Sequence, residues 1–324
     1  MLKLLAATVA RHYLRKPDLA DFLATRLPDA RALLAAVRNE AAFRLGAARL
    51  PRLTQLNVEL TSRCNVACSY CDVNRGLRRG ARDLDPAVVA RLIETSPTVR
   101  TLLPFQWGEP LLYPALDEVL AHATRRGVRS YLTTNGTLLD GARLARLADA
   151  GLTRLTVSLD GSPESHVARR GYAQAPVLAR LAEARAAQRR LGLAVRLDVS
   201  MVVDESVAGE LDAFRSRLAP LCDRVQFIPR LRTGRRTRAC REPWRGALVV
   251  LSDGRVTACC ADQDGALDLG RVDTRPAAGG PTPGMVFASE PFVALRRAQR
   301  AGRFPGPCAS CDECHVPGVS RRFA

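Results

Sequence analysis

Between residues 51 and 232, short apolar runs typical of strands alternate with stretches in which apolar residues recur at helical spacing. The runs predict six strands, Leu56–Leu60, Thr101–Phe105, Val128–Thr133, Arg154–Leu159, Ala194–Val202 and Arg224–Ile228. The stretches between them predict helices over Pro86–Glu94, Ala115–Arg126, Gly141–Ala150, Pro176–Leu191 and Ser206–Leu218. Alternating strands and helices are typical of an α/β fold with a parallel sheet. A closed barrel has about eight such units, so we expect a partial (β/α)6 TIM-like barrel with its active site at the carboxyl ends of the strands.

The segments that flank this region differ from it. Residues 1–50 have helical spacing in Leu19–Leu27 and Ala30–Phe43, which predicts a helical N-terminal segment packed on the next domain. Residues 233–324 contain more glycine and proline, and Ser252-Asp-Gly predicts a β-hairpin there. We therefore expect a partial barrel over residues 51–232, followed by a small cysteine-rich α+β domain that a bound metal stabilises.

The composition narrows the class of protein. The chain has 324 residues, of which 47% are apolar and 25% charged, as in folded globular proteins. Its net charge is +17, but the arginines are scattered and aromatic residues make up only 5%, so nucleic acid is not expected as substrate. An anionic small molecule or an acidic peptide remains open.

Apolar runs do not suggest a membrane protein. None reaches the roughly 20 residues of a membrane span, and the apolar stretch Leu4–Ala10 is too short for a cleaved signal peptide. We expect no membrane association.

Ten cysteines carry more information than the charge. They are Cys64, Cys68, Cys71, Cys222, Cys240, Cys259, Cys260, Cys308, Cys311 and Cys314. Tight clusters separated by long cysteine-free stretches are typical of metal or iron–sulfur ligation in a reducing compartment, so a cytoplasmic location is expected.

The first cysteine cluster has the spacing C-x3-C-x2-C and directly follows the first predicted strand. Three thiolates on one loop can bind three irons of a cubane cluster and leave the fourth iron open. A zinc loop is the alternative, but zinc prefers four protein ligands or a C-x2-C pair.

This motif, on this loop and with an aromatic residue before its last cysteine, resembles the radical SAM superfamily over residues 51–232. The resemblance implies a [4Fe-4S] cluster on Cys64, Cys68 and Cys71. It also implies S-adenosylmethionine (SAM) bound at the open iron and an external one-electron reductant such as flavodoxin or ferredoxin. In that family, reductive cleavage of SAM gives a 5′-deoxyadenosyl radical that abstracts a hydrogen atom from the substrate.

The resemblance also implies a SAM pocket. Gln106-Trp-Gly-Glu resembles the family's GGE motif, although Trp107 stands where the first glycine usually is. Thr134-Asn-Gly and Ser158-Leu-Asp-Gly resemble further signatures at strand ends. The implied cofactor-binding residues are Tyr70, Gly108, Glu109, Asn135, Ser158, Asp160, Arg170 and Met201. For Met201 a place in the barrel core is the alternative.

The later cysteines resemble the C-terminal auxiliary-cluster domains SPASM and Twitch of radical SAM enzymes. The resemblance implies one auxiliary [4Fe-4S] cluster on Cys240, Cys259, Cys308 and Cys311, and Cys314 could replace Cys311. Structural zinc is the alternative, since four thiolates suit both. Cys260 adjoins a ligand, and Cys222 is expected to be a buried thiol.

An auxiliary cluster suits an oxidation, because it can accept the electron that a substrate radical loses. The proton that also leaves needs a base, for which Asp198, Asp160 and His166 are candidates. The alternative for Asp198 is a salt bridge with Arg196. We expect the oxidation of a small metabolite or natural-product intermediate. Maturation of a peptide by crosslinking or residue oxidation is the alternative, and RNA modification a distant one.

Overall fold

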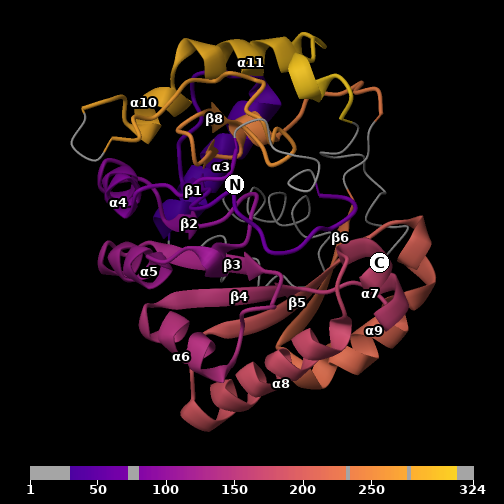
Figure 1. Cartoon of the computed structure of the whole chain (residues 1–324). Helices are drawn as coiled ribbons and strands as arrows, with labels where there is room; N and C mark the ends of the chain where they lie inside the picture. The colour runs from indigo at the N-terminus through magenta and orange to yellow at the C-terminus, as the bar shows by residue number, and fades with distance from the viewer. Residues whose placement is uncertain (1–29, 72–79, 231–233, 276–278, 312–324) are drawn as a thin grey trace.

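The computed structural model describes residues 30–71, 80–230, 234–275 and 279–311. Its centre is an eight-stranded sheet in the order β6-β5-β4-β3-β2-β1-β7-β8 (Figure 1). All six predicted strands are confirmed as neighbouring parallel strands: β1 (Gln55–Val58), β2 (Thr101–Leu103), β3 (Arg129–Thr134), β4 (Leu152–Ser158), β5 (Arg196–Val203) and β6 (Arg224–Pro229). The sheet is open, with β6 and β8 at its edges, as expected for a partial TIM-like barrel.

The sheet continues past the predicted domain boundary at residue 232. Strand β7 (Ala247–Val250) pairs in parallel with β1, from Gln55 beside Ala247 to Val58 beside Val250. Strand β8 (Val256–Thr257) then pairs antiparallel with β7, which confirms the predicted hairpin. The sequence pattern did not indicate the pairing of β7 with β1, and the division into three domains stays a prediction.

Helices cover one face of the parallel strands (Figure 1). They are α4 (Pro86–Glu94), α5 (Leu116–Arg125), α6 (Gly141–Asp149), α7 (Pro163–Arg170), α8 (Gln174–Leu191) and α9 (Leu211–Leu218). The sequence predicted all of them except α7. The segment predicted as one helix from Ser206 begins as the 3-10 helix η3 (Glu205–Glu210) and continues as α9.

Local sequence signals explain where these helices begin. Asp85 accepts a hydrogen bond from Ala87 N at 2.8 Å, and Asp140 accepts one from Arg143 N at 2.6 Å, so each carboxylate caps the helix that follows it. Apolar residues on the inner sides of the helices pack with alternate strand residues in one continuous core. The opposite strand residues are left to form the other face of the sheet.

The first and last described segments lie side by side at one end of the molecule (Figure 1). Helix α3 (Ala30–Leu45) contacts the segment before β7, where the Phe43 and Trp244 rings lie edge to face at 5.4 Å. The buried Arg241 pairs with Glu40 at 2.6 Å. Residues 30–50 thus pack on the C-terminal region as well as on the start of β1. The predicted helix Leu19–Leu27 and the stretch Leu4–Ala10 lie outside the described residues.

Helices α10 (Pro283–Phe287) and α11 (Glu290–Arg300), which the sequence did not predict, complete this end. Arg296 on α11 is fully buried and donates to three carbonyl oxygens, those of Ala48, Pro243 and Phe287. Burial without a facing carboxylate lowers the pKa of Arg296 to about 10. One guanidinium therefore holds three separate segments together.

None of the helices in the described part of the chain is long and apolar enough to cross a membrane.

Candidate functional site

The first cysteine cluster lies on the loop that leaves the carboxyl end of β1. Cys64 and Cys71 are half-buried and Cys68 is buried. Burial raises the pKa of Cys68 to about 11, Arg170 opposes this rise, and both neighbouring cysteines add to it. The three thiols therefore lie close enough to affect one another. A bound metal would deprotonate them, because thiolate is the ligating form.

The number of thiols on this loop favours a cubane cluster over zinc. Three thiolates suit three irons of a cubane cluster, whereas zinc prefers four protein ligands.

Gly108 packs closely against the backbone that leads into the cluster loop. Its φ is +103°, and a Cβ there would lie 2.5 Å from Thr61 O and 2.8 Å from Arg63 O, the segment that leads into Cys64. Glu109 N also donates to Arg63 O at 2.8 Å. Only glycine fits this position, since a side chain would displace the cluster loop.

Glu109 is buried and accepts three hydrogen bonds. Its donors are Leu111 N at 3.0 Å, Thr134 Oγ1 at 2.6 Å and Asn135 N at 2.7 Å. Burial raises the pKa of Glu109, and these donors oppose the rise. A carboxylate offers about four acceptor positions, so one remains for a further donor such as an ammonium group.

Asn135 connects the end of β3 to the cluster loop. Its Nδ2 donates to Asn65 Oδ1 at 2.8 Å, and its Oδ1 accepts from Thr137 N and Oγ1 at 2.9 Å and 2.7 Å. These bonds occupy the amide and hold the residue next to Cys64. Direct contact of Asn135 with a cofactor stays a prediction.

Asp160 is the centre of a second set of contacts, on the other side of the loop. It is fully buried, and its Oδ2 accepts from the Tyr70 hydroxyl at 2.7 Å and pairs with Arg170 Nε at 3.0 Å. Oδ1 accepts from Val202 N at 3.1 Å, and Arg169 Nε lies 3.4 Å from Oδ2. Asp160 is therefore surrounded by donors, which does not favour a role as a base.

Arg169 and Arg170, which the sequence left as equal candidates, have different partners. Arg169 forms a close pair with Asp204, both distances being 2.9 Å, and donates to Val202 O at 2.7 Å. Arg170 is buried and pairs with Asp160, the one carboxylate that it meets within the described residues. Both guanidinium groups lie near the Tyr70 ring centre, that of Arg169 at 5.0 Å and that of Arg170 at 5.8 Å. Arg170 also lowers the pKa of Cys68 against the effect of burial, so its charge acts on the cluster thiols.

The geometry does not favour His166 as a catalytic base, and that role stays a prediction. The ring is fully buried, and its Nδ1 accepts from Asp160 N at 3.2 Å, so the neutral tautomer carries its proton on Nε2. Burial, together with Arg170, lowers the pKa of His166 to about 4. The lone pair of this buried imidazole is engaged, and in this structure His166 holds the turn after β4.

Asp198, the other predicted catalytic base, has its oxygens engaged, and its catalytic role stays a prediction. It is fully buried near the amino end of β5, far along the strand from the carboxyl edge, and Arg196 binds both of its oxygens at 2.8 Å and 2.7 Å. Gln226 donates to it at 2.7 Å. The salt-bridged alternative is therefore confirmed.

Met201 lies three residues after Asp198 on β5, so its side chain is on the opposite face of the sheet. It is fully buried in the hydrophobic core together with Leu197 and Val199. This position supports the core alternative, and a contact of Met201 with the cofactor stays a prediction. Ser158 is the half-buried last residue of β4, beside Ser200 on β5, and its contact with SAM stays a prediction.

The side chains of Gln299, Arg236 and Asp262 connect the segments that carry the auxiliary cysteines. Cys240 N donates to Gln299 Oε1 at 2.9 Å, and Arg236 Nη2 donates to Cys311 Sγ at 3.3 Å. Burial raises the pKa of Cys308, Arg236 and Gln299 lower it, and Cys311 and Asp262 raise it. Cys308 is thus near every one of these groups.

Cys259 joins the same region through a turn, because Asp262 N donates to Cys259 O at 3.4 Å. Cys260 beside it is exposed. Cys314 lies outside the described residues, so the choice between Cys311 and Cys314 stays open. Cys222 lies elsewhere, buried as expected, with its thiol against Leu218 O at 3.2 Å.

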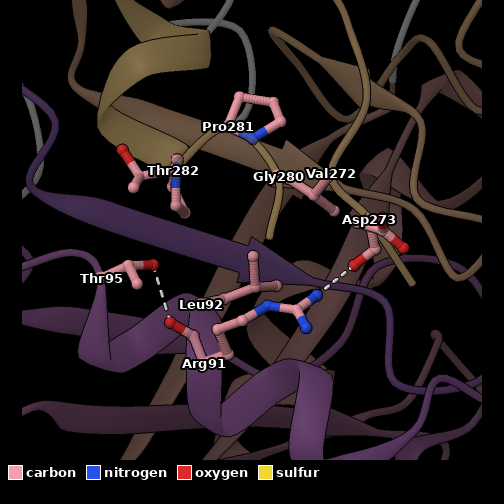
Figure 2. A pocket seen from close by; sticks show the side chains of 9 residues that line it. Arg91, Leu92, Thr95, Val272, Asp273, Gly280, Pro281 and Thr282 are labelled. Carbon is pink, nitrogen blue, oxygen red and sulfur yellow. Dashed lines mark hydrogen bonds between the residues drawn. The ribbon is translucent and has the colours of Figure 1, made fainter. Parts of the chain in front are cut away.

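A small surface pocket between α4 and residues 272–273 and 280–283 is separate from both cysteine sites. Figure 2 shows Arg91 reaching from α4 toward Asp273 beneath Gly280 and Pro281. Arg91 donates to the carbonyl oxygens of Asp273 and Arg275, so its guanidinium is already engaged. The pocket contains none of the predicted site residues.

The sequence analysis missed several residues that shape these sites. Asp204, which orients Arg169, and Gln299, which contacts two cysteine segments, carry no motif of their own. A buried glutamine in the apolar pattern of α11 is the one signal that could have drawn attention to Gln299.

Known proteins resemble this chain in sequence. The model of the radical SAM superfamily matches residues 58–205. GTP 3′,8-cyclase 2 of Mycobacterium tuberculosis is 47% identical over 140 residues, which make up 41% of this chain and 39% of that protein. The chain thus matches about two fifths of the length of this curated relative.

Solved structures resemble it over most of its length. BtrN in complex with AdoMet and 2-DOIA has a TM-score of 0.55 at 21% identity, covering 81% of this chain and 93% of BtrN. anSMEcpe with bound AdoMet and the Cp18Cys peptide has a TM-score of 0.57 at 16% identity, covering 84% of this chain and 96% of anSMEcpe. At these identities the likeness shows the fold.

Proposed function

We propose that this chain, a radical SAM enzyme by its residues 58–205, abstracts a hydrogen atom from a small polar metabolite and oxidises it. The observation that supports this most directly is the position of Cys64, Cys68 and Cys71, three interacting thiols on one loop at the carboxyl end of β1. A [4Fe-4S] cluster and SAM bound there supply the reductive cleavage that produces the 5′-deoxyadenosyl radical. The thiols require a reducing, cytoplasmic environment and an external one-electron reductant.

The residues around the loop would hold SAM by charge and by shape. The remaining acceptor position of Glu109 suits the SAM ammonium group, and Arg170 suits its carboxylate. Tyr70, held by Asp160, offers its ring to the adenine. Gly108 and Asn135 keep the loop in place rather than contact the reacting atoms.

The face of the sheet opposite the helices supports a polar substrate. Asp198, Ser200 and Val202 on β5 alternate with the core residues and face the same side as Gln226 on β6. Thr156 and Ser158 on β4 pair with Asp198 and Ser200 on that side. Asp198 and Gln226 bind each other, so the hydroxyl groups of this face are what favours a hydrophilic small molecule over an apolar peptide segment.

The auxiliary cysteines support the oxidative form of the proposal. A cluster held by Cys240, Cys259, Cys308 and Cys311 would accept the electron that a substrate radical loses. His166, Asp160 and Asp198 all have engaged acceptors, so the proposal assigns the base to none of them.

A second candidate rests on the similarity to GTP 3′,8-cyclase 2, whose name states a cyclisation of GTP. The net charge of +17 suits an anionic nucleotide. In this case the reaction on the substrate would be a cyclisation rather than an oxidation. Peptide modification is a further alternative, because anSMEcpe has a similar fold and binds a peptide.

SAM cleavage tests the shared part of these proposals. The protein, reconstituted with iron and sulfide under anaerobic conditions, is incubated with SAM and dithionite, and 5′-deoxyadenosine is measured by chromatography. We expect turnover in the parent, its loss in Cys68→Ala, and full retention in Cys222→Ala, which also removes a buried thiol. Equal turnover in all three would refute the proposal.

The substrate class is tested in the same assay with GTP, an aminocyclitol and a short cysteine-containing peptide. More 5′-deoxyadenosine with the aminocyclitol supports oxidation of a small metabolite. More 5′-deoxyadenosine with only GTP or only the peptide overturns this substrate class. About eight irons per chain would indicate two cubane clusters, whereas about four irons with one zinc would make the C-terminal site structural.

A further inference from the structure

Gln299 on α11 contacts two of the auxiliary cysteine segments at once. The side chain is 1% exposed, and its Oε1 accepts from Cys240 N at 2.9 Å. Its Nε2 meets no acceptor in good hydrogen-bond geometry within the described ranges, but the amide interacts with the Cys308 thiol and lowers the pKa of that thiol. One end of the amide is therefore satisfied, and the other has only a weak interaction with a thiol.

A buried N–H group without an acceptor destabilises a protein by about 1–3 kcal/mol. Such a group is expected to find its acceptor when the site is filled. A thiolate or a cluster sulfur carries negative charge and accepts N–H hydrogen bonds, whereas a neutral thiol is a poor acceptor. The orphaned Nε2 thus fits a centre whose cysteines are deprotonated.

Arg236 supplies a second donor from a different part of the chain. Its Nη2 donates to Cys311 Sγ at 3.3 Å. The backbone of its segment is fixed to the cysteine loop, since Gly234 N donates to Ser310 O at 2.7 Å and Arg236 N to Ala309 O at 3.3 Å. Two donors from separate segments therefore converge on the sulfurs of Cys308 and Cys311.

We propose that Gln299 is a positioning residue of the auxiliary centre, which holds the Cys240 backbone and the Cys308 sulfur in one geometry. With Arg236 it directs N–H donors at the sulfur ligands and raises the reduction potential of the iron–sulfur cluster bound there. This inference rests on the auxiliary cluster of the proposed function. Hydrogen bonds to cluster sulfurs stabilise the reduced, more negative state, and such outer groups also orient the ligands.

The test isolates the auxiliary centre from the SAM site. In a background with Cys64, Cys68 and Cys71 all replaced by alanine, the full chain is reconstituted and its iron and zinc are counted. Its midpoint potential is then measured by EPR-monitored titration. Gln299→Leu removes the amide, and Gln299→Glu keeps an acceptor for Cys240 N but replaces the donor.

Gln188→Leu is the matched control. Gln188 is also buried, on α8, but its amide donates to Val195 O at 2.8 Å and Asp223 Oδ2 at 3.0 Å, near the amino end of β5. It reports what the loss of any buried glutamine does to folding and to iron content. We expect about four irons and an unchanged potential in this control.

In Gln299→Leu we expect the reduced-to-oxidised ratio at a fixed potential to fall about tenfold, which is about 59 mV for a one-electron couple. Gln299→Glu shifts the potential further in the same direction, because it adds a negative charge. Loss of iron from both variants, with the control fully loaded, would also support the positioning role.

Two results overturn the inference. One is zinc in place of iron in the triple-alanine background, and the other is an unchanged potential in both loaded Gln299 variants. If Gln299→Leu fails to fold, Gln299→Glu and Arg236→Lys test the same donors with smaller changes. A failure of the proposed function is distinguishable, because the chain with its first cluster intact would then release no 5′-deoxyadenosine while the potentials still shift.

Discussion

Replacement of Asp160 by asparagine tests whether this residue organises the SAM side of the cluster loop. Asp160 is fully buried and holds Tyr70, Arg170 and Val202 N, while Arg169 also lies 3.4 Å from it. Asparagine has nearly the same shape, so the substitution changes charge and hydrogen bonding rather than volume. In the variant, the side-chain NH2 group of asparagine would replace one carboxylate oxygen, so a donor would stand where Tyr70 and Arg170 need an acceptor.

The expected magnitude follows from the partners. Arg169 keeps Asp204, but Arg170 loses the one carboxylate that it meets within the described residues. Removal of one partner from a buried ion pair destabilises by about 3–5 kcal/mol, because the remaining charge is left uncompensated. We therefore expect a loss of this size in the free energy of unfolding, together with a displaced Tyr70 and Arg170.

The assay combines urea unfolding under anaerobic conditions with SAM binding to the reconstituted protein. Asp198→Asn is the matched control, since Asp198 is equally buried and ion-paired but lies near the amino end of β5. Both variants should lower the unfolding midpoint. Only Asp160→Asn should also weaken SAM binding, by more than tenfold, and reduce 5′-deoxyadenosine formation.

The reasoning is refuted if Asp160→Asn unfolds at the parent midpoint and binds SAM normally. Equal loss of SAM binding in both variants would also refute it, because a general loss of stability would then explain the effect.

Three further predictions concern other described contacts. Gly108→Ala should reduce the iron bound by the cluster loop in an iron assay, because the added Cβ meets two carbonyl oxygens. Gly127→Ala is the control, since Gly127 also has a positive φ but has open space around it, and this variant should bind iron like the parent. Arg296→Met leaves three buried carbonyl oxygens unpaired and should lower the free energy of unfolding by about 2–4 kcal/mol in urea titrations, against about 0.5 kcal/mol for the exposed Arg297→Met. His166 has a lowered pKa of about 4, so the unfolded chain binds the proton more strongly. Stability should therefore fall as the pH drops from about 6.5 toward 4, by at most about 1.4 kcal/mol per pH unit, and His166→Gln should flatten this dependence in unfolding measurements across that range.

The local pattern predicted the parallel strands because each is an apolar run bounded by turn residues. It missed α7 because its eight residues, Pro163–Arg170, are mostly polar and show no apolar stripe, although Ser162 before Pro163 is a typical helix start. It also missed the pairing of β7 with β1, because nothing in either segment specifies a partner some 190 residues away.

The candidate site was predictable to the extent that its residues follow strands. The three cysteines and Glu109 could be placed from their positions after β1 and β2. The roles of Asp160 and Asp198 could not be distinguished in the same way, because one lies just after β4 and the other lies on the neighbouring β5. Asp160 meets the cluster loop because it lies at the carboxyl end of its strand and pairs with Arg170 of α7. Asp198 lies near the amino end of β5 and pairs with Arg196 of the same strand.

The place of β7 in the sheet has a consequence for how the chain folds. After β6 forms one edge, the chain returns across the whole sheet to lay β7 against β1. Until residues 247–250 arrive, the hydrogen-bonding groups of β1 on that side stay open, so the central strand behaves as an edge strand. A fragment ending near residue 232 would keep this apolar edge exposed, and strand-to-strand aggregation rather than independent folding is its expected fate. The long-range pairing also makes the last part of the sheet the slowest to form, after the local crossovers that precede it.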